Sequence, residues 1–353
     1  MNNKNLYVDF HVIQTVPPSC VNRDDIGRPK TAMYGGVNRA RVSSQAWKHA
    51  IREKFKDIFA DEKLGFRTKY SVDIITDAIK ELNPTLSDEE ATKKADEALA
   101  NAGIKSNSKK GNTTDALFFI SSVQAKQLAQ LSIDGEKDKN LYKEALKNNP
   151  SIDIALFGRM VASDQYLNVD ATSQVAHSIS THAVQNEYDY FTALDDKKTD
   201  TAGAGHLGTM EFNSSTLYRY ATVNVSKLHE LIGDDTADTI KGFAKAFISS
   251  MPTGKQNSYA NGTLPNVVYV TINDSQPVNL VGAFEKPISS NSGYVEKSMS
   301  TLFEYAQNVY NNYCNPPIKS FVIGGSDLIS GAKTVNINQL LDELKEYIKN
   351  EVK

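Results

Sequence analysis

Residues 22–54, NRDDIGRPKTAMYGGVNRARVSSQAWKHAIREK, combine a basic, glycine-containing loop with the start of a helix. Eight basic residues stand here against three acids, a local net charge of +5 in a chain whose formal net charge is −3. A basic loop that leads into a helix N-terminus favours a phosphate ligand, because the first helical N–H groups have no partner within the helix. A solvated basic surface without a ligand is the alternative. The basic residues are Arg23, Arg28, Lys30, Arg39, Arg41, Lys48, Arg52 and Lys54.

The segments on either side of the basic loop predict regular structure. Alternating apolar and polar residues over 6–16 predict a β-strand, and Pro17 and Pro18 are expected to end it because proline donates no hydrogen bond to a sheet. Ser43 or Ser44 is expected to cap the helix that follows. That helix has an apolar stripe of Trp47, Ala50, Ile51 and Phe55, and a different, outward face with Lys48 and Arg52.

The composition, with 40% hydrophobic and 23% charged residues over 353 positions, is typical of a soluble globular protein of roughly two domains. The slightly negative net charge excludes a protein that coats nucleic acid with its whole surface, so any such contact is expected in a local groove. Cys20 and Cys314 lie far apart, which excludes a zinc motif or a disulfide framework and indicates a reducing compartment. No signal peptide or membrane span is expected, so the predicted localisation is cytoplasmic.

The remaining sequence predicts an α+β sandwich in which helices cross the strands on one side. Residues 71–149 are predicted to be helical apart from a polar loop at 106–112, with a capping box at Ser87 and a helix stop at Gly103. One of these helices is predicted to include 115–131. Further strands are predicted at 152–160, 176–184, 267–274 and 319–325, and further helices at 227–251 with a break near Gly233, at 292–313 and at 336–353.

Two β segments, 187–194 and 209–225, are joined by a long glycine-rich loop and predict a protruding hairpin or arm. An apolar residue on such an arm, for example Phe191, or Met160 from the segment before it, is suited to wedging between bases. Their spacing alone favours burial in a core for both residues.

Catalytic motifs are absent from the sequence, which contains no GxSxG, Walker A, GxGxxG or HExxH pattern. His177 and His182 are an odd number of residues apart in a predicted strand, so they point to opposite faces and do not share a metal. Asp24 and Asp25 lie among arginines and are expected to form ion pairs rather than to bind Mg²⁺. No cofactor, metal site or catalytic residue is expected, and the protein is not expected to be an enzyme.

Nucleic acid is the ligand that the basic stretch favours. Basic side chains there supply affinity for a backbone independently of base sequence, and polar residues at the helix start can donate to phosphate or ribose. Lys255, in the polar loop 252–259, adds one more candidate contact. The candidates within the basic stretch are Arg23, Arg41, Ser43, Ser44, Gln45, Lys48 and Arg52.

A series of short motifs occurs in a characteristic order along the chain. The motifs read SC-x-NRDD, GG-x2-R-x-RVSSQ-x2-K-x-A-x-R, D-x-AL-x-GRM, AHSISTH, FTA-x-DD, HLGT-x-EF, YRYA, KQ-x-x-YA and AFEK. In this order they resemble the CasC-type backbone subunit of type I-E CRISPR Cascade complexes, over about residues 7–286. The sequence after about residue 288 is less diagnostic.

The resemblance implies an RNA-recognition-motif-like (ferredoxin-like) palm with a helical fingers insertion and a β-hairpin thumb. Such subunits polymerise along CRISPR RNA, displace a base at regular intervals with the thumb, and leave the other bases free to pair with target DNA. The implied partners are CRISPR RNA, target DNA through that guide, further copies of the chain and the other Cascade subunits. DNA cutting belongs to a separate helicase-nuclease. The implied domains are 1–58 for the first part of the palm, 59–183 for mainly helical fingers, 184–215 for the thumb and 216–353 for the rest of the palm.

The resemblance also implies roles for single residues. The main implied RNA-backbone contacts are Arg23, Ser43, Gln45, Lys48 and Arg52. Lys255 and Gln256 are additional implied contacts. The implied base-kinking residues are Met160 of GRM together with Phe191, Thr192 and Leu194 of FTALDD. Two features depart from the family pattern: a short segment between GRM and VDA, and His49 at a position where a second basic residue is expected. His49 therefore predicts a weaker or pH-sensitive phosphate contact.

Two alternative functions remain open at the level of the sequence. One is a metal-dependent ribonuclease, because related backbone subunits of other CRISPR types cleave RNA with an aspartate near the thumb, for which Asp195 and Asp196 are candidates. The other is a structural protein that self-assembles without nucleic acid.

Overall fold

The computed structural model describes residues 5–107, 111–192, 207–325, 329 and 331–352. It separates into two compact units, called here the first and the second unit, and each unit is built from several stretches of the chain. The first unit consists of Met1–Ile51, Val175–Thr222 and Phe243–Glu343, and the second of Arg52–Gln174, Val223–Gly242 and Leu344–Lys353.

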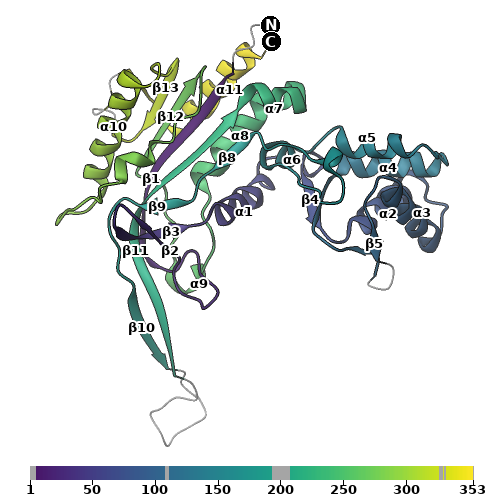
Figure 1. Cartoon of the computed structure of the whole chain (residues 1–353), viewed down its shortest axis with the longest axis horizontal. Helices are drawn as coiled ribbons and strands as arrows, with labels where there is room; N and C mark the ends of the chain where they lie inside the picture. The colour runs from purple at the N-terminus through teal and green to yellow at the C-terminus, as the bar shows by residue number, and fades with distance from the viewer. Residues whose placement is uncertain (1–4, 108–110, 193–206, 326–328, 330, 353) are drawn as a thin grey trace, which may run out of the picture. The chain divides into compact units, whose positions relative to one another are not determined.

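The first unit is organised around a β-sheet (Figure 1) with the strand order β14-β13-β12-β1-β11-β9-β3-β2, and both β10 and β8 (Ser173–Val175) pair with β11 outside this order. The predicted mixed α/β organisation with a central sheet is confirmed. The strands are β1 (Tyr7–Ser19), β2 (Thr31–Tyr34), β3 (Val37–Val42), β9 (Ser178–Ser180), β10 (Glu187–Thr192), β11 (Leu207–Asn224), β12 (Val267–Asn273), β13 (Lys319–Ile323) and β14 (Lys333–Thr334).

The prediction of helices on one side of the strands is wrong, because both faces of this sheet are covered. This explains why β12 is an almost continuous apolar run and is buried along its whole length. On one face, Phe303 of α10 (Val295–Asn312) meets the ring of Tyr269 edge-on at 5.6 Å. On the other, Phe10 of β1 contacts Phe243 and Phe247 of α8 (Thr236–Ser249), with ring centroids 5.6 and 6.0 Å apart. The other short helices of this unit are η5 (Leu280–Phe284) and α9 (Gln256–Tyr259).

The strand predicted at the N-terminus runs past its two prolines, so the predicted stop at Pro17 is wrong. β1 continues to Ser19. Its antiparallel ladder with β12 ends at the Ile13–Val267 pair, so the prolines lie beyond that ladder and their missing N–H groups cost it no hydrogen bond.

The helix predicted after the basic loop is α1 (Ser44–Phe55), and Ser43 accepts a hydrogen bond from the Ala46 N–H at its start. Its predicted apolar stripe is confirmed, because Trp47, Ala50, Ile51 and Phe55 are all buried. α1 runs across the boundary between the two units, as does the C-terminal helix α11 (Ile337–Glu351).

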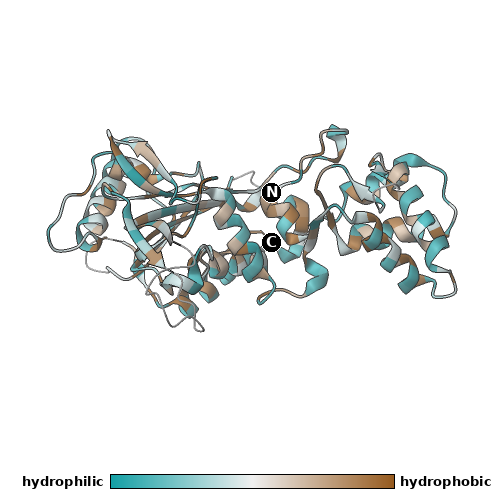
Figure 2. Ribbon diagram, turned by 90° about the horizontal axis from the view of Figure 1, so that it is seen from below, coloured by the Kyte–Doolittle hydropathy of each residue, from teal (hydrophilic) through white to brown (hydrophobic). Residues whose placement is uncertain are grey.

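The second unit contains a helical core (Figure 2), in which single helices carry hydrophilic residues on one side and hydrophobic residues on the other. The capping box at Ser87 and the helix end before Gly103 are as predicted. The elements are η1 (Asp61–Lys63), β4 (Gly65–Thr68), α2 (Ser71–Leu82), α3 (Asp88–Asn101), β5 (Ser106–Asn107), β6 (Thr113–Thr114), β7 (Phe118–Ser121), α4 (Ser122–Ile133), α5 (Lys139–Lys147), α6 (Ile152–Phe157), η3 (Gln165–Leu167), α7 (Val225–Ile232) and η4 (Gly233–Asp235).

Two predictions for this unit are wrong. The strand expected over 152–160 is the helix α6, because a short apolar run has no periodicity that separates a buried helix from a buried strand. The helix expected over 115–131 starts only at Ser122, because Phe118–Ser121 pairs with β4 instead. None of the helices in the described ranges has both the length and the apolar character needed to cross a membrane.

Candidate nucleic-acid interface

The loop before β2 is folded by its own backbone contacts rather than by ion pairs among its charged residues. The Asp24 carboxylate accepts hydrogen bonds from the N–H groups of Ile26 and Arg28 at 3.1 and 2.8 Å. Arg28 forms its ion pair with Glu211 of β11 at 2.6 Å. The predicted pairing of Asp24 with neighbouring arginines is therefore wrong, because an aspartate in a turn is within reach of backbone donors two to four residues ahead.

Two predicted phosphate contacts from distant parts of the sequence come together in the first unit. A Cβ atom placed on Gly254 would lie 2.1 Å from the carbonyl oxygen of Val21, so the loop with Lys255 packs directly on the loop with Arg23. The charges of Arg23 and Lys255 both act on the Cys20 thiol, although burial outweighs them and raises the pKa of Cys20. The close approach of these two backbones makes one basic surface out of two loops.

The start of α1 adjoins the same loop. The side-chain oxygen of Asn22 accepts a hydrogen bond from the Ser43 N–H at 2.9 Å, which holds the loop against the helix start. Ser43 is buried and its hydroxyl caps the helix, whereas Gln45, the other predicted RNA contact at this helix start, is exposed. Gln45 is thus better placed than Ser43 to meet a ligand.

Lys48 is half-buried and immediately follows Trp47, which anchors α1. Burial lowers the pKa of Lys48. On the anchored face, the Trp47 indole N–H donates to the Ser178 hydroxyl at 2.9 Å, and the Arg219 guanidinium lies 3.9 Å from the centre of the Trp47 ring. The guanidinium of Arg219 also donates to the carbonyl of Phe247. The arginine of the YRYA motif therefore positions the helix that carries the predicted RNA contacts.

Not every basic residue of the 22–54 stretch belongs to a basic surface. Arg39 is fully buried, and its guanidinium donates to the carbonyls of Ser180 and Phe284 at 2.8 Å each. Burial lowers its pKa. Arg39 thus links β3, β9 and η5, and part of the local charge that the sequence showed serves the core.

In the second unit, Arg52 has a structural partner. Its guanidinium forms a charge-assisted pair with the buried carboxylate of Asp153, with both nitrogen–oxygen distances 3.0 Å. The same guanidinium lies 4.6 Å from the centre of the Phe119 ring and donates to the Gly65 carbonyl. The contact of Arg52 with RNA stays a prediction, and it competes with this ion pair.

Met160 is held in an exposed position by the arginine before it. Arg159 is buried and donates to the carbonyls of Leu146, Leu167 and Phe119, while its backbone pairs with Val169. Burial lowers the pKa of Arg159 to about 10. Met160, the next residue, is 86% exposed. The core position that spacing favoured for Met160 is wrong, because Arg159 takes the buried place.

The predicted arm is confirmed as an antiparallel pair of β10 and β11, with a register from Glu187–Phe212 to Thr192–Leu207. Every residue of β10 is exposed, and Figure 1 shows the pair extending away from the sheet of its unit. Phe191 is 40% exposed, so its predicted core position is also wrong. Leu194, Asp195 and Asp196 lie outside the described residues.

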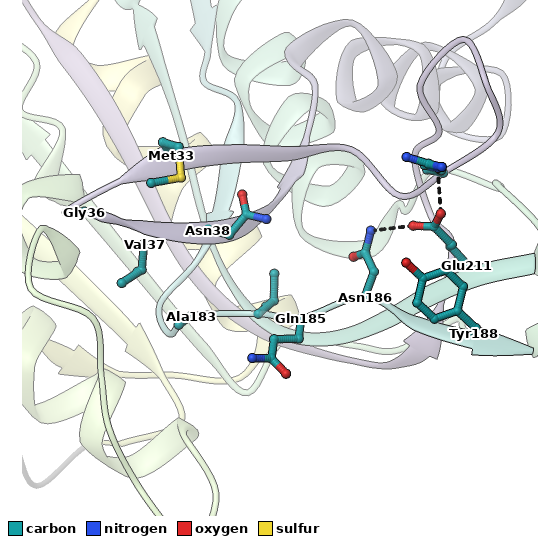
Figure 3. Close-up of a pocket in the computed structure, with 11 residues that line it drawn as sticks. Met33, Gly36, Val37, Asn38, Ala183, Gln185, Asn186, Tyr188 and Glu211 are labelled. Carbon is teal, nitrogen blue, oxygen red and sulfur yellow. Dashed lines mark hydrogen bonds and ion pairs between the residues drawn. The ribbon is translucent and has the colours of Figure 1, made fainter.

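A shallow hollow of about 670 Å³ lies at the root of this arm (Figure 3). Glu211 receives the Arg28 ion pair and a hydrogen bond from Asn186 at 3.0 Å, so these charges neutralise each other. The exposed side chains of Tyr188 and Met33 line part of the hollow. Tyr188 was not among the predicted contacts, although its alternation with Tyr190 in EYDYFT indicates an aromatic face on the arm.

Within the described ranges, no group of three or more His, Cys, Asp or Glu side chains is placed to hold a metal ion. His182 is buried, accepts the Thr216 N–H at 3.0 Å and stacks on Tyr294. His177 lies beside Arg41, 3.1 Å from its guanidinium. The two histidines therefore have separate surroundings.

The fold and its surface define a mixed α/β protein in which basic loops adjoin the start of one anchored helix. The chain belongs to the CT1975-like protein family of CRISPR-associated proteins, whose family model matches residues 8–349. The predicted resemblance is confirmed at this level, and the type I-E assignment stays a prediction.

Two solved structures are similar along almost the whole chain. A chain of a "CRISPR RNA-guided surveillance complex, pre-nicking" superposes with a TM-score of 0.83 at 29% identity, over 97% of this chain and 100% of that one. A chain of a "CRISPR RNA-guided surveillance complex" superposes with a TM-score of 0.63 at 26% identity, over 96% and 99%. A comparison with curated proteins gave no match.

Proposed function

We propose that this protein is the CRISPR RNA-binding backbone subunit of a type I-E Cascade surveillance complex. Copies of the chain polymerise along the guide RNA in the cytoplasm and present it for pairing with target DNA in antiviral defence. The first unit acts as an RNA-recognition-motif-like palm, the second supplies the fingers, and the β10–β11 arm is the thumb. The subunit itself is not an enzyme: base pairing supplies sequence specificity, and the protein contacts backbone and shape.

The observation that carries this proposal is the meeting of Arg23 and Lys255 from two loops beside the start of α1. Positive side chains that track a strand give affinity without base preference, which is what a guide of variable sequence requires. Family membership and the similarity to surveillance-complex chains support the same function.

Replacing both Arg23 and Lys255 with glutamine is expected to weaken binding of single-stranded RNA about a hundredfold, or about tenfold for each charge-assisted contact. The slope of log K against log salt should become shallower by about 1.4, because each lost phosphate contact contributes about 0.7 for single strands. Binding titrations at several salt concentrations, with guides of unrelated sequence, measure both quantities.

The matched control for this experiment is Lys349→Gln, which removes an exposed charge from the last turn of α11. It should leave affinity and salt slope unchanged. A loss confined to one guide sequence would contradict the proposal, as would purified wild-type protein that neither carries nor binds nuclease-protected RNA.

The arm is proposed to displace bases, with Phe191 as its wedge. Phe191 faces Gly208 across the ladder, and a Cβ atom at Gly208 would lie 2.3 Å from the Phe191 ring, so the glycine leaves room for that ring. An exposed aromatic side chain at such a site is suited to unstacking a base.

Phe191→Ala is expected to keep assembly on RNA but to lower the chemical reactivity of the periodically displaced nucleotides toward that of their neighbours. Nucleotide-resolution probing of the assembled particle measures this change. Tyr190→Ala, on the opposite face of β10, serves as the control. Reactivity that is the same in Phe191→Ala and wild type would remove Phe191 from the wedge.

A further inference from the structure

Three cationic or protonatable side chains meet beside the basic loop, although they come from separate parts of the chain. Lys30 stands just before β2, Arg41 lies on β3, and His177 immediately precedes β9. The N–H of Arg41 donates to the Lys30 carbonyl at 2.9 Å, and Lys30 and Arg41 line the same small recess together with Asn22. The Arg41 guanidinium lies 3.1 Å from Nδ1 of His177.

The hydrogen bond between Arg41 and His177 defines the state of the imidazole. A guanidinium only donates, so Nδ1 of His177 is the acceptor, and the imidazole is neutral with its proton on Nε2. The Arg41 guanidinium also donates to the Thr31 carbonyl at 3.2 Å, which holds it beside the histidine. In this state Arg41 gives one of its donors to a neighbouring side chain rather than to a ligand.

Among the described residues, no acid forms an ion pair with this cluster. Within the part of the chain that the structure describes, neither Lys30 nor Arg41 forms an ion pair with a carboxylate, although Arg28 and Arg52 both do. Burial lowers the pKa of His177, and so do the positive charges of Arg41 on β3 and Lys30 before β2. Like charges held together without a counter-charge are stabilised by an anion.

We propose that Lys30, Arg41 and His177 form a binding site for one phosphodiester group of the RNA, and that occupation of this site is coupled to uptake of one proton by His177. The proton comes from solvent and is added to Nδ1. The hydrogen bond between Arg41 and His177 then ends, and both side chains donate to the phosphate oxygens. This inference rests on the proposed RNA-binding function and adds two residues to its interface, Lys30 and His177.

Proton uptake makes the affinity for RNA depend on pH in a defined direction. The bound state holds one proton more than the free state, so affinity rises as pH falls, by at most about tenfold per pH unit. The dependence is confined to the interval between the pKa of His177 in the free protein, which is below its ordinary value of about 6.5, and its higher pKa in the complex.

The test is the affinity of the full chain for one single-stranded RNA between about pH 8 and pH 5.5, at constant ionic strength. Wild type is expected to bind more tightly at the acidic end, and His177→Gln to lose that gain while matching wild type at pH 8. Glutamine keeps an acceptor for Arg41 but takes up no proton. His229→Gln is the matched control, because His229 lies on α7 in the second unit and should leave the pH dependence unchanged. His49→Gln tests the rival source of pH dependence, because the sequence predicts a pH-sensitive phosphate contact at His49.

The possible outcomes separate this inference from the proposed function. Absence of RNA binding by wild type at every pH would contradict the function itself. If wild type and His177→Gln show the same pH dependence of RNA binding, the role of His177 is overturned and the RNA-binding function stands. The same holds if the pH dependence is lost in His49→Gln instead. A His177 pKa, measured by NMR, that rises on RNA addition supports the proposal, and one that stays constant overturns it. A rise with inorganic phosphate alone would assign the site to free phosphate rather than to the RNA backbone.

Discussion

Replacing Trp47 with alanine is expected to lower the free energy of unfolding by about 3–5 kcal/mol, the range for deletion of a large buried aromatic side chain. Trp47 is 1% exposed and holds α1 on the sheet through the Ser178 hydroxyl and the Arg219 guanidinium. Arg219 is itself fully buried, so loss of the ring also removes the aromatic face on which its charge rests. Equilibrium unfolding in urea measures the change.

Trp47→Phe separates the two anchors. Phenylalanine keeps an aromatic face for Arg219 but has no N–H for Ser178, so a smaller loss of about 1–2 kcal/mol is expected. At low denaturant, where both variants are folded, Trp47→Ala should bind RNA more weakly than Trp47→Phe, because Lys48 and Gln45 depend on the seating of the helix. A loss below about 1 kcal/mol in Trp47→Ala would show that α1 is held by other contacts.

The second large effect concerns two buried titratable groups on β1, Asp9 and His11. Burial raises the pKa of Asp9 to about 6, against hydrogen bonds from Tyr220, Asn273 and the Val278 N–H. Burial lowers the pKa of His11 to about 3. The two shifts have opposite consequences for stability in acid.

Between about pH 6 and pH 4, the folded state binds an extra proton at Asp9 and the unfolded state binds one at His11. As the pH falls, protonation of Asp9 therefore raises the free energy of unfolding and protonation of His11 in the unfolded state lowers it. The two contributions nearly cancel. Asp9→Asn removes the gain. The variant is expected to lose about 2 kcal/mol of stability relative to wild type between pH 6 and pH 4, because the slope approaches about 1.4 kcal/mol per pH unit only between the two pKa values of the aspartate.

Urea unfolding of wild type, Asp9→Asn and the double variant Asp9→Asn/His11→Gln at pH 6, 5 and 4 measures these contributions. The double variant should follow wild type in its pH dependence, because both linked protons are absent. If the difference between Asp9→Asn and wild type is the same at all three pH values, Asp9 is not protonated in the folded state within this range.

Local patterns in the sequence were sufficient for the elements whose determinants are neighbours along the chain. The apolar stripe of α1, the capping box at Ser87 and the alternating strands of the arm were predicted because the groups that stabilise them are a few residues apart. The motif order also predicted a CRISPR-associated protein, which the family match confirms at that level. The predictions failed at 152–160 and 115–121, where a short apolar run forms helix or strand according to its distant partners.

The candidate interface divides in the same way. Its residue types and the helix that presents them were determined by the sequence itself, because charge and periodicity are local properties. Only the tertiary structure decided that Arg39 is buried, that Arg52 pairs with Asp153, and that Lys255 and His177 join the basic loop. The physical reason is that a charged side chain is either paired or available to a ligand according to what the fold places within a few ångströms of it, and those neighbours are as far away in sequence as residues 41 and 177.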